Sequence, residues 1–305
     1  MKGMFMQGLA VLLRERPSLD DIEQALSGFD IVKRVEPGEF SWMSGLFGVV
    51  VAMRPQVNGY VVVDVVDRPW PDAMGDPKTD SLLFGAWSMG FFGPLTFPGG
   101  MQRAVSHAYG WPGAKAAAEG HRAFVRVRVS YVLGAAAGAP VAPADQDAEG
   151  ELMFATNVAR ALSRIPGALA YFNPNGEVLL HPDELHLSMG QARDQDLPPL
   201  DAWSNVRMFK VDDAWMMMDT VGLGQLDLED HEAWFRKGAC DPNSVGTWLR
   251  NLSVYVQRGG KIADGDTSDG PRGVHWRARR VDESQLSPPR AVIRWAPDDG
   301  TKPPW

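Results

Sequence analysis

The pattern of apolar residues predicts both strands and helices along the chain. Mostly apolar runs at 5–13, 45–53 and 59–66 are typical of buried strands. The segment 121–133 alternates instead, and this alternation indicates a half-exposed antiparallel strand. Its valines and Tyr131 point to one face, and the opposite face carries Arg126, Arg128 and Ser130.

Helical periodicity appears between these strands. Ser18 is placed to cap a helix, and apolar residues at helical spacing continue from 152 to 165, before Pro166. Further helices are expected to begin at Pro182 and to cover 244–257, where Trp248, Leu249, Leu252, Tyr255 and Val256 share one side. Further strands are expected at 168–173, at 205–223 with a hinge at 211–213, at 273–281 and at 290–297.

The order of these elements predicts an α+β fold with largely antiparallel sheets and flanking helices, because helices do not follow each strand. The segment 134–150 is rich in small residues, proline and acidic residues, which is typical of a linker. We therefore expect two sub-domains, 1–145 and 146–305, with two ferredoxin-like halves as one architecture and a single compact unit as the other.

Composition narrows the class of protein. Apolar residues make up 45% of the chain and charged residues 22%, as in globular proteins, and no apolar run reaches the roughly 18 residues of a membrane span. Gln7 and Gly8 interrupt the first apolar stretch and argue against a signal peptide. Cys240 is the single cysteine, so we expect no disulfide and a cytoplasmic protein. The net charge of −8 argues against direct nucleic-acid binding.

The acidic stretch "DGDTSDG" at 264–270 raises the question of a calcium loop. Asp264, Asp266 and Ser268 have the spacing of the first ligands of such a loop. The glycine expected at the sixth position is Asp269, however, and the glutamate expected at the twelfth is His275. The pattern favours a polar turn whose aspartates bind backbone groups.

Other motifs stop short of a catalytic or cofactor site. Ser88 in "AWSMG" is followed by glycine and proline where a nucleophile elbow needs a helix. "HEAWF" at 231–235 lacks the second histidine of a zinc protease, and His181 and His186 are spaced wrongly to share a metal on a helix. "GLGQLD" lacks the third glycine of a dinucleotide fingerprint, and Cys240 lies in a loop or helix entry. We predict no cofactor and no metal.

Paired carboxylates leave one enzymatic alternative. Asp64 and Asp67 flank the end of a strand, and the following loop at 70–80 adds further carboxylates. A metal-dependent hydrolase or nuclease would use such a pair. A capped, proline-stiffened loop is the simpler interpretation.

The last third of the chain resembles a known bacterial family. "MDTVGLGQLDLED" at 218–230 and "LRNLSVYVQRGGKIADGDT" at 249–267 are similar to domain of unknown function 4261, whose members end on the same glycine-isoleucine-DGDT pattern. The resemblance covers about residues 200–295 and has the DGDT turn as its sharpest point. It implies a structural family turn and carries no chemistry.

A second resemblance concerns the segment 57–94, "VNGYVVVDVVDRPWPDAMGDPKTDSLLFGAWSMGFFGP". It is similar to bacterial relatives found beside secreted toxins. This resemblance implies an immunity protein that binds and neutralises a cognate toxin, such as a type VI secretion effector with a nuclease domain. It implies no residue roles.

An inhibitor of a nuclease competes with a polyanion for a basic cleft, which acidic residues and aromatic anchors can do. We expect no membrane partner, and a structural subunit of a larger assembly is the third hypothesis. The residues predicted to contact the toxin are Asp212, Asp213, Asp227, Glu229 and Asp230, with Trp215 or Trp234 as the anchor.

Overall fold

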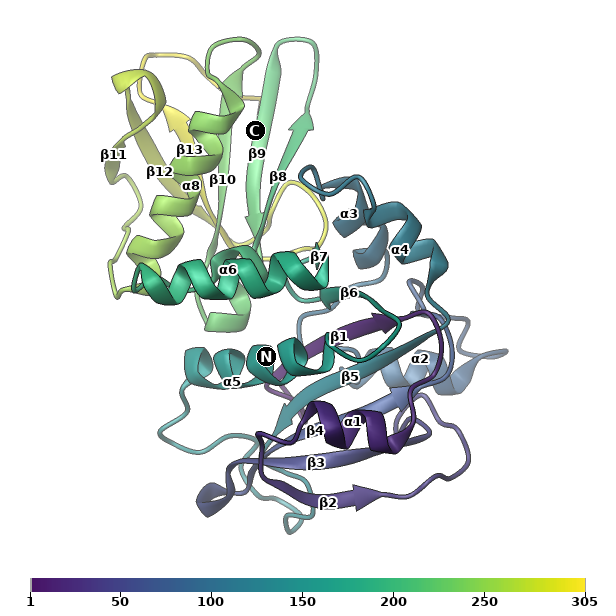
Figure 1. The fold of residues 1–305 in the computed structure, drawn as a ribbon. Coiled ribbons are helices and arrows are strands. Elements are labelled where there is room, and N and C mark those ends of the chain that lie inside the picture. The colour runs from purple at the N-terminus through teal and green to yellow at the C-terminus, as the bar shows by residue number, and fades with distance from the viewer. Residues whose placement is uncertain (1, 305) are drawn as a thin grey trace. The chain divides into compact units, whose positions relative to one another are not determined.

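The computed structural model describes residues 2–304, which form two compact units (Figure 1). The first unit ends at Gln191 and the second begins at Ala192. Each unit combines helices with a mostly antiparallel sheet, which confirms the predicted α+β class.

The boundary expected at residue 145 lies inside the first unit. The segment 134–150 joins strand β5 to helix α5, and strands formed after residue 146 pair into the same sheet as the first strand. A sequence rich in small residues and proline marks a loop equally well within one domain, so composition alone placed the boundary too early.

The first unit is built on a seven-stranded sheet with the order β2-β3-β4-β5-β1-β6-β7, and every neighbouring pair is antiparallel. The apolar strand β1 lies inside this sheet, between β5 and β6, and is buried over its whole length. The strands are β1 (Gln7–Leu13), β2 (Ile31–Val35), β3 (Phe47–Arg54), β4 (Gly59–Val66), β5 (Ala123–Ser130), β6 (Ala168–Asn173) and β7 (Val178–Leu180).

Helix α1 begins at the cap that the sequence predicts, and α5 begins at a second side-chain cap. Ser18 and Asp21 form a reciprocal capping box at the start of α1, and Asp147 accepts a hydrogen bond from Gly150 N at the start of α5. The helices are α1 (Leu19–Ala25), α2 (Ser81–Ser88), α3 (Gly100–Ser106), α4 (Ala114–Gly120), α5 (Ala148–Leu162) and α6 (Pro182–Asp194), with a short 3₁₀ turn η1 (Pro55–Val57).

Strand β5 is not half-exposed, as its alternation had suggested. Arg126 and Arg128 are buried, and both donate hydrogen bonds to the carboxylate of Asp64 on the neighbouring strand β4. The guanidinium of Arg128 also lies 4.4 Å from the ring centroid of Phe5. The polar face of β5 is therefore covered by aromatic side chains, and its two arginines share the carboxylate of Asp64 within the sheet.

The covering layer comes from the excursion between β4 and β5. Trp70 is its centre, with its ring 5.2 Å from Phe92 and 5.0 Å from Phe172 between centroids. Helices α2, α3 and α4 add buried side chains to the same cluster. The proline- and glycine-rich segment is thus an ordered lid over one face of the first sheet.

The second unit is built on a six-stranded sheet with the order β11-β12-β13-β10-β9-β8. β10 and β13 are parallel, whereas the other neighbours are antiparallel. The strands are β8 (Asn205–Lys210), β9 (Trp215–Val221), β10 (Asp230–Arg236), β11 (Thr267–Asp269), β12 (His275–Val281) and β13 (Val292–Pro297).

One long helix, α8 (Pro242–Gln257), packs on one face of this sheet (Figure 1). Its buried residues include Trp248, whose ring centroid lies 4.9 Å from that of Trp276 and 5.3 Å from that of Trp295. The remaining short elements are α7 (Leu200–Trp203) and the 3₁₀ turns η2 (Leu223–Leu226) and η3 (Pro271–Gly273).

Neither unit has the ferredoxin-like arrangement considered from the sequence. That fold is a β-α-β-β-α-β unit, whereas these sheets have seven and six strands in other orders. The sequence missed the additional strands because β2, β7 and β11 are short and because β10 carries charged residues among apolar ones.

Candidate functional site

A row of charged residues crosses the second sheet on the face opposite α8. Asp219 of β9 lies beside Arg207 of β8 and beside Glu232 of β10 in the strand register, and Glu232 lies beside Arg294 of β13. Arg279 of β12 is the next residue in the row. All but Arg279 are buried.

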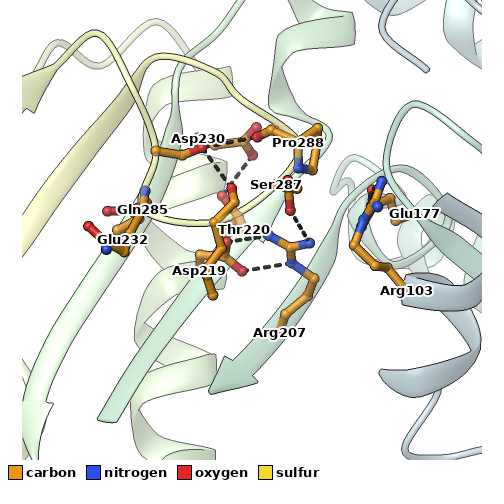
Figure 2. Close-up of polar contacts among 12 residues, drawn as sticks. Arg103, Glu177, Arg207, Asp219, Thr220, Asp230, Glu232, Gln285, Ser287 and Pro288 are labelled. Carbon is orange, nitrogen blue, oxygen red and sulfur yellow. Dashed lines mark hydrogen bonds and ion pairs between the residues drawn. The ribbon is translucent and has the colours of Figure 1, made fainter. Parts of the chain in front are cut away.

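The buried arginines of this row form ion pairs with its carboxylates, and Figure 2 shows the pair of Arg207 with Asp219. Arg207 donates two hydrogen bonds to the Asp219 carboxylate, from Nε to Oδ1 at 2.9 Å and from Nη2 to Oδ2 at 2.5 Å. Arg294 Nε donates to Glu232 at 2.7 Å. A bidentate arginine–carboxylate pair is the strongest form of ion pair available to a protein interior.

The charged row also forms hydrogen bonds with the loop between β12 and β13. Arg290 from this loop donates to Asp219 at 2.8 Å and to Asp230 at 3.1 Å. Arg207 donates to the carbonyl of Ser287 at 2.9 Å, and Glu232 accepts from Gln285 N at 2.6 Å (Figure 2). The charged row is thus a structural clamp that holds residues 285–290 against the sheet.

Asp230 belongs to this clamp rather than to the surface. Its carboxylate accepts hydrogen bonds from Thr220 Oγ1 and from the backbone N–H groups of Gly222 and Leu223. Burial raises the pKa of Asp230, and Arg290 opposes this shift. Asp230 was predicted to contact a toxin, but the structure assigns its carboxylate to internal partners.

The two predicted anchors are buried as well. The guanidinium carbon of Arg236 lies 5.2 Å from the ring centroid of Trp215. The guanidinium carbon of Arg294 lies 5.8 Å from the ring centroid of Trp234. Burial of both rings does not fit a role as anchors, because apolar rings on a sheet face serve packing before recognition. The sequence does not show which tryptophans the sheet covers.

The four remaining predicted residues are accessible or partly so, but they lie at opposite ends of β9. Asp212 and Asp213 form the β8–β9 turn, where Asp213 pairs with Lys210 at 2.6 Å. Asp227 and Glu229 follow η2 at the other end, where Glu229 pairs with Arg280 at 2.7 Å. A seven-residue strand is about 23 Å long, so the structure does not bring these pairs together.

The acidic turn 264–270 is not a calcium cage. Asp264 accepts a hydrogen bond from Arg280 N at 2.9 Å, and Asp266 accepts one from Ala263 N at 2.7 Å. Asp269 pairs with His275 at 2.9 Å. The three carboxylates point to different partners, and no set of three or more metal-ligating side chains converges anywhere in residues 2–304.

A groove of about 580 Å³ lies between α8 and this turn. Four residues of the family-like pattern line it, namely Tyr255, Ile262, Asp266 and Thr267. The rest of its lining comes from α8, the acidic turn and β13, and consists of Trp248, Asn251, Leu252, Lys261, Ser268, Asp269 and Trp295.

Tyr255 is the most accessible aromatic residue of this groove, at 52% exposure. Its ring is nevertheless fixed, because it packs against the backbone of Gly260, where an added Cβ would lie 2.4 Å from the ring. Its hydroxyl donates to the Lys261 carbonyl at 3.5 Å. The sequence placed Tyr255 on the apolar side of α8 and so missed it as an exposed group.

Asp64 and Asp67, the carboxylate pair of the hydrolase alternative, have separate partners in the structure. Burial opposes ionisation of Asp64, but Arg126 and Arg128 outweigh it and hold the pKa of Asp64 below its usual range. Asp67 is exposed and pairs with Arg16 at 3.2 Å. Asp64 is thus buried and bound to two arginines.

The serine and cysteine considered from the sequence do not form activated nucleophiles. Ser88 ends helix α2 and donates to the Phe84 carbonyl at 2.8 Å, so it lies at the end of a helix and not on a strand-to-helix turn. Cys240 precedes α8, as predicted, and burial raises the pKa of its thiol. Within residues 2–304, no helix is both long and apolar enough to cross a lipid bilayer.

Part of the chain matches the model of a known family. Residues 219–296 match the model of a domain of unknown function, DUF4261. A search of curated proteins found no match, and neither did a search of solved structures.

The family match includes most of the second unit. It begins at Asp219 in β9 and ends in β13, so it contains α8, the acidic turn, the groove between them and all of the clamp except Arg207. The resemblance to this family seen in the sequence is therefore confirmed.

Proposed function

We propose that the protein acts by binding another protein through the groove between α8 and the acidic turn. In this proposal it is an immunity protein that neutralises a cognate secreted bacterial toxin. The partner's basic side chains and an apolar tip enter the groove beside Tyr255.

The observation that carries the proposal is a fixed, exposed tyrosine beside an acidic rim. Tyrosines in such positions supply much of the affinity in protein interfaces because their rings cost little entropy to immobilise. Gly260 and the Lys261 carbonyl already hold Tyr255, and the neighbouring Asp266 and Asp269 are exposed. The groove therefore offers an aromatic anchor together with negative charge.

A basic nuclease domain is the partner that this chemistry fits best. Its cleft binds a polyanion, so exposed carboxylates can compete for the same cationic groups and can also speed association. The net charge of −8 adds long-range attraction for a basic partner. The resemblance of segment 57–94 to relatives found beside toxins supports the same class of partner.

The first test is recovery of the partner from the native cell. The tagged protein is used as bait at low and at high salt, and the retained proteins are identified by mass spectrometry. We expect one stoichiometric protein with a basic domain, retained less at high salt. Co-expression of the bait should also abolish the toxicity of that protein.

Matched variants locate the contact surface. Tyr255→Ala combined with Asp269→Lys changes the groove, and Tyr109→Ala combined with Asp213→Lys makes the same chemical changes at exposed positions elsewhere. We expect only the groove variant to lose the partner and the protection. Loss in the control variant alone would move the contact to the surface around Tyr109 or Asp213, which the two single variants would distinguish.

A different result would reject the binding proposal as a whole. If no protein partner is retained and the purified protein instead carries a metal or a small molecule, the hydrolase alternative becomes the better account. Divalent metal ions that bind only the native state would then raise the melting temperature with concentration.

A further inference from the structure

A second groove, of about 630 Å³, lies in the first unit between α1 and α5. The exposed side of α5 and the residues just after it supply one wall, and His186 of α6 closes one side. Its lining consists of Asp21, Gln24, Ala25, Ser27, Phe29, Asn157, Arg160, Ala161, Arg164, Ile165, Pro166 and His186.

The α5 wall carries positive charge at helical spacing. Asn157, Arg160 and Arg164 follow one another at intervals of three and four, so they lie on the same side of the helix and its C-terminal turn. Among the described residues, neither Arg160 nor Arg164 forms an ion pair with a carboxylate. Other arginines of this unit, such as Arg103 with Glu177 at 2.6 Å, do have such a partner.

His186 of α6 contacts Arg164 at the edge of this wall. Its Nε2 lies 3.4 Å from Arg164 Nε and 3.4 Å from Ser163 Oγ. Burial lowers the pKa of His186, the nearby Arg164 and Arg160 lower it further, and Asp183 partly opposes them. The imidazole is therefore neutral near pH 7, where Nε2 can accept the hydrogen bond from Arg164.

The opposite wall does not neutralise this charge. Asp21 is the one carboxylate in the lining, and its Oδ2 accepts hydrogen bonds from Ser18 N at 2.8 Å and Ser18 Oγ at 2.6 Å. These bonds hold the Asp21 carboxylate at the start of α1. Gln24 and Ser27 are exposed and uncharged.

We propose that this groove binds the phosphate group of a small molecule, with Arg160 and Arg164 as the phosphate ligands. A guanidinium can donate parallel hydrogen bonds to two phosphate oxygens. Two arginines on the same side of α5 and its C-terminal turn can therefore bind one phosphate group together. Asn157 supplies an amide donor on the same face, and His186 supplies a further donor once it takes up a proton. The volume is that of a pocket for a molecule larger than phosphate alone.

This site is independent of the proposed toxin-binding groove, because all of its residues belong to the first unit. Its failure would leave the proposed function untouched. Confirmation of the phosphate site would add a small-molecule ligand to the protein partner proposed above.

The test is calorimetric titration of the full chain with pyrophosphate and with AMP at constant ionic strength. We expect saturable binding of at least one probe, weakened about tenfold or more by either Arg160→Gln or Arg164→Gln, as for loss of a charge-assisted hydrogen bond. Arg193→Gln is the matched control, because Arg193 is exposed on α6 and lies outside this groove.

A second readout follows His186 itself. In NMR spectra, a bound phosphate should raise the pKa of the His186 imidazole, and this change should be absent in the Arg160→Gln/Arg164→Gln double variant. The melting temperature of each variant checks that it is folded. No saturable binding of either probe, or binding that survives in a folded double variant, would overturn the proposal.

Discussion

Asp219 and Glu232 lie directly opposite each other on β9 and β10, and both side chains are fully buried. Two like charges in facing positions destabilise a sheet unless other groups neutralise them. Arg207 and Arg290 do so for Asp219, and Arg294 does so for Glu232. The stability of the second unit therefore depends on arginines from three separate segments.

Replacing Arg207 should be costly. Arg207→Met leaves the buried Asp219 with one arginine fewer, and breaking a buried ion pair in this way typically costs about 3–5 kcal/mol. We expect a loss of this size in the free energy of unfolding, measured by denaturant titration with tryptophan fluorescence. Arg207→Met combined with Asp219→Leu should be more stable than the single variant, since the buried carboxylate that lost a partner is gone and Arg290 keeps its hydrogen bond to Asp230.

The control for this prediction is Arg277→Met. Arg277 pairs with Asp298 at the surface at 2.6 Å, and an exposed pair is worth only about 0–1 kcal/mol. Equal losses for Arg207→Met and Arg277→Met would show that the charged row does not act as a clamp.

His231 should make the second unit sensitive to mild acid. Burial lowers its pKa to about 4, whereas an unfolded histidine titrates near pH 6.5. The unfolded chain thus binds the proton first, and stability should fall by about 3 kcal/mol as the pH drops from about 6.5 to 4.

The variant His231→Gln checks this assignment. Its free energy of unfolding should change less between pH 7 and pH 4 than that of the parent protein. Parallel pH profiles for the two proteins would exclude His231 as the source of the acid sensitivity.

Asp64 should make the first unit sensitive to acid as well, at a lower pH than His231 does in the second unit. Its folded-state pKa lies below the usual value, so its stabilisation is present above about pH 4 and is lost as the pH falls through the folded pKa. Asp64→Asn leaves Arg126 and Arg128 without their shared carboxylate, at a cost of about 3–5 kcal/mol at pH 7.

The gap in stability between the parent protein and Asp64→Asn should therefore narrow below pH 4. Urea denaturation at pH 7 and pH 3 measures it. A gap that stays constant with pH would show that the carboxylate's charge is not what stabilises the first unit.

Gly270, at the end of the acidic turn, should not tolerate a side chain. An added Cβ would lie 2.1 Å from Cδ1 of Trp276, whose ring is fully buried and cannot move aside. We expect Gly270→Ala to lower the melting temperature. Gly190→Ala, in the open on α6, should instead raise stability by about 0.5–1 kcal/mol, because alanine favours a helix. Equal effects would mean that Trp276 does not confine this turn.

Calcium should leave the acidic turn unaffected. Asp264, Asp266 and Asp269 already have separate partners, so no ligand set is assembled. We expect an unchanged melting temperature at millimolar calcium, because only a ligand that binds the native state shifts the transition. A rise that is lost in Asp266→Asn would contradict the structure of this turn.

Periodicity predicted the buried strands and long helices of this fold, but not what covers them. The alternation in β5 is the same whether water or aromatic rings cover its arginines. The rings that do so come from a segment without any period, and the carboxylate comes from β4. Burial of a polar face is a tertiary property, so local sequence underestimated it.

The candidate site was predicted only in part, for the same reason. The DGDT turn was found from its sequence, and its use of carboxylates as turn acceptors is confirmed at Asp266. Asp230 seemed available because its partner Arg290 is distant in sequence. Tyr255 seemed buried because its helix spacing does not reveal that Gly260 holds the ring at the rim.

The position of β13 has a consequence for the order in which the second unit can form during synthesis. β13 is inserted between β10 and β12, so the sheet stays in two pieces until residues 292–297 have left the ribosome. Until then β8, β9 and β10 expose an open edge, and the β11–β12 hairpin has no strand to join. The nascent chain thus has an unpaired strand edge on β10, and β13, the last strand of this sheet along the chain, closes it.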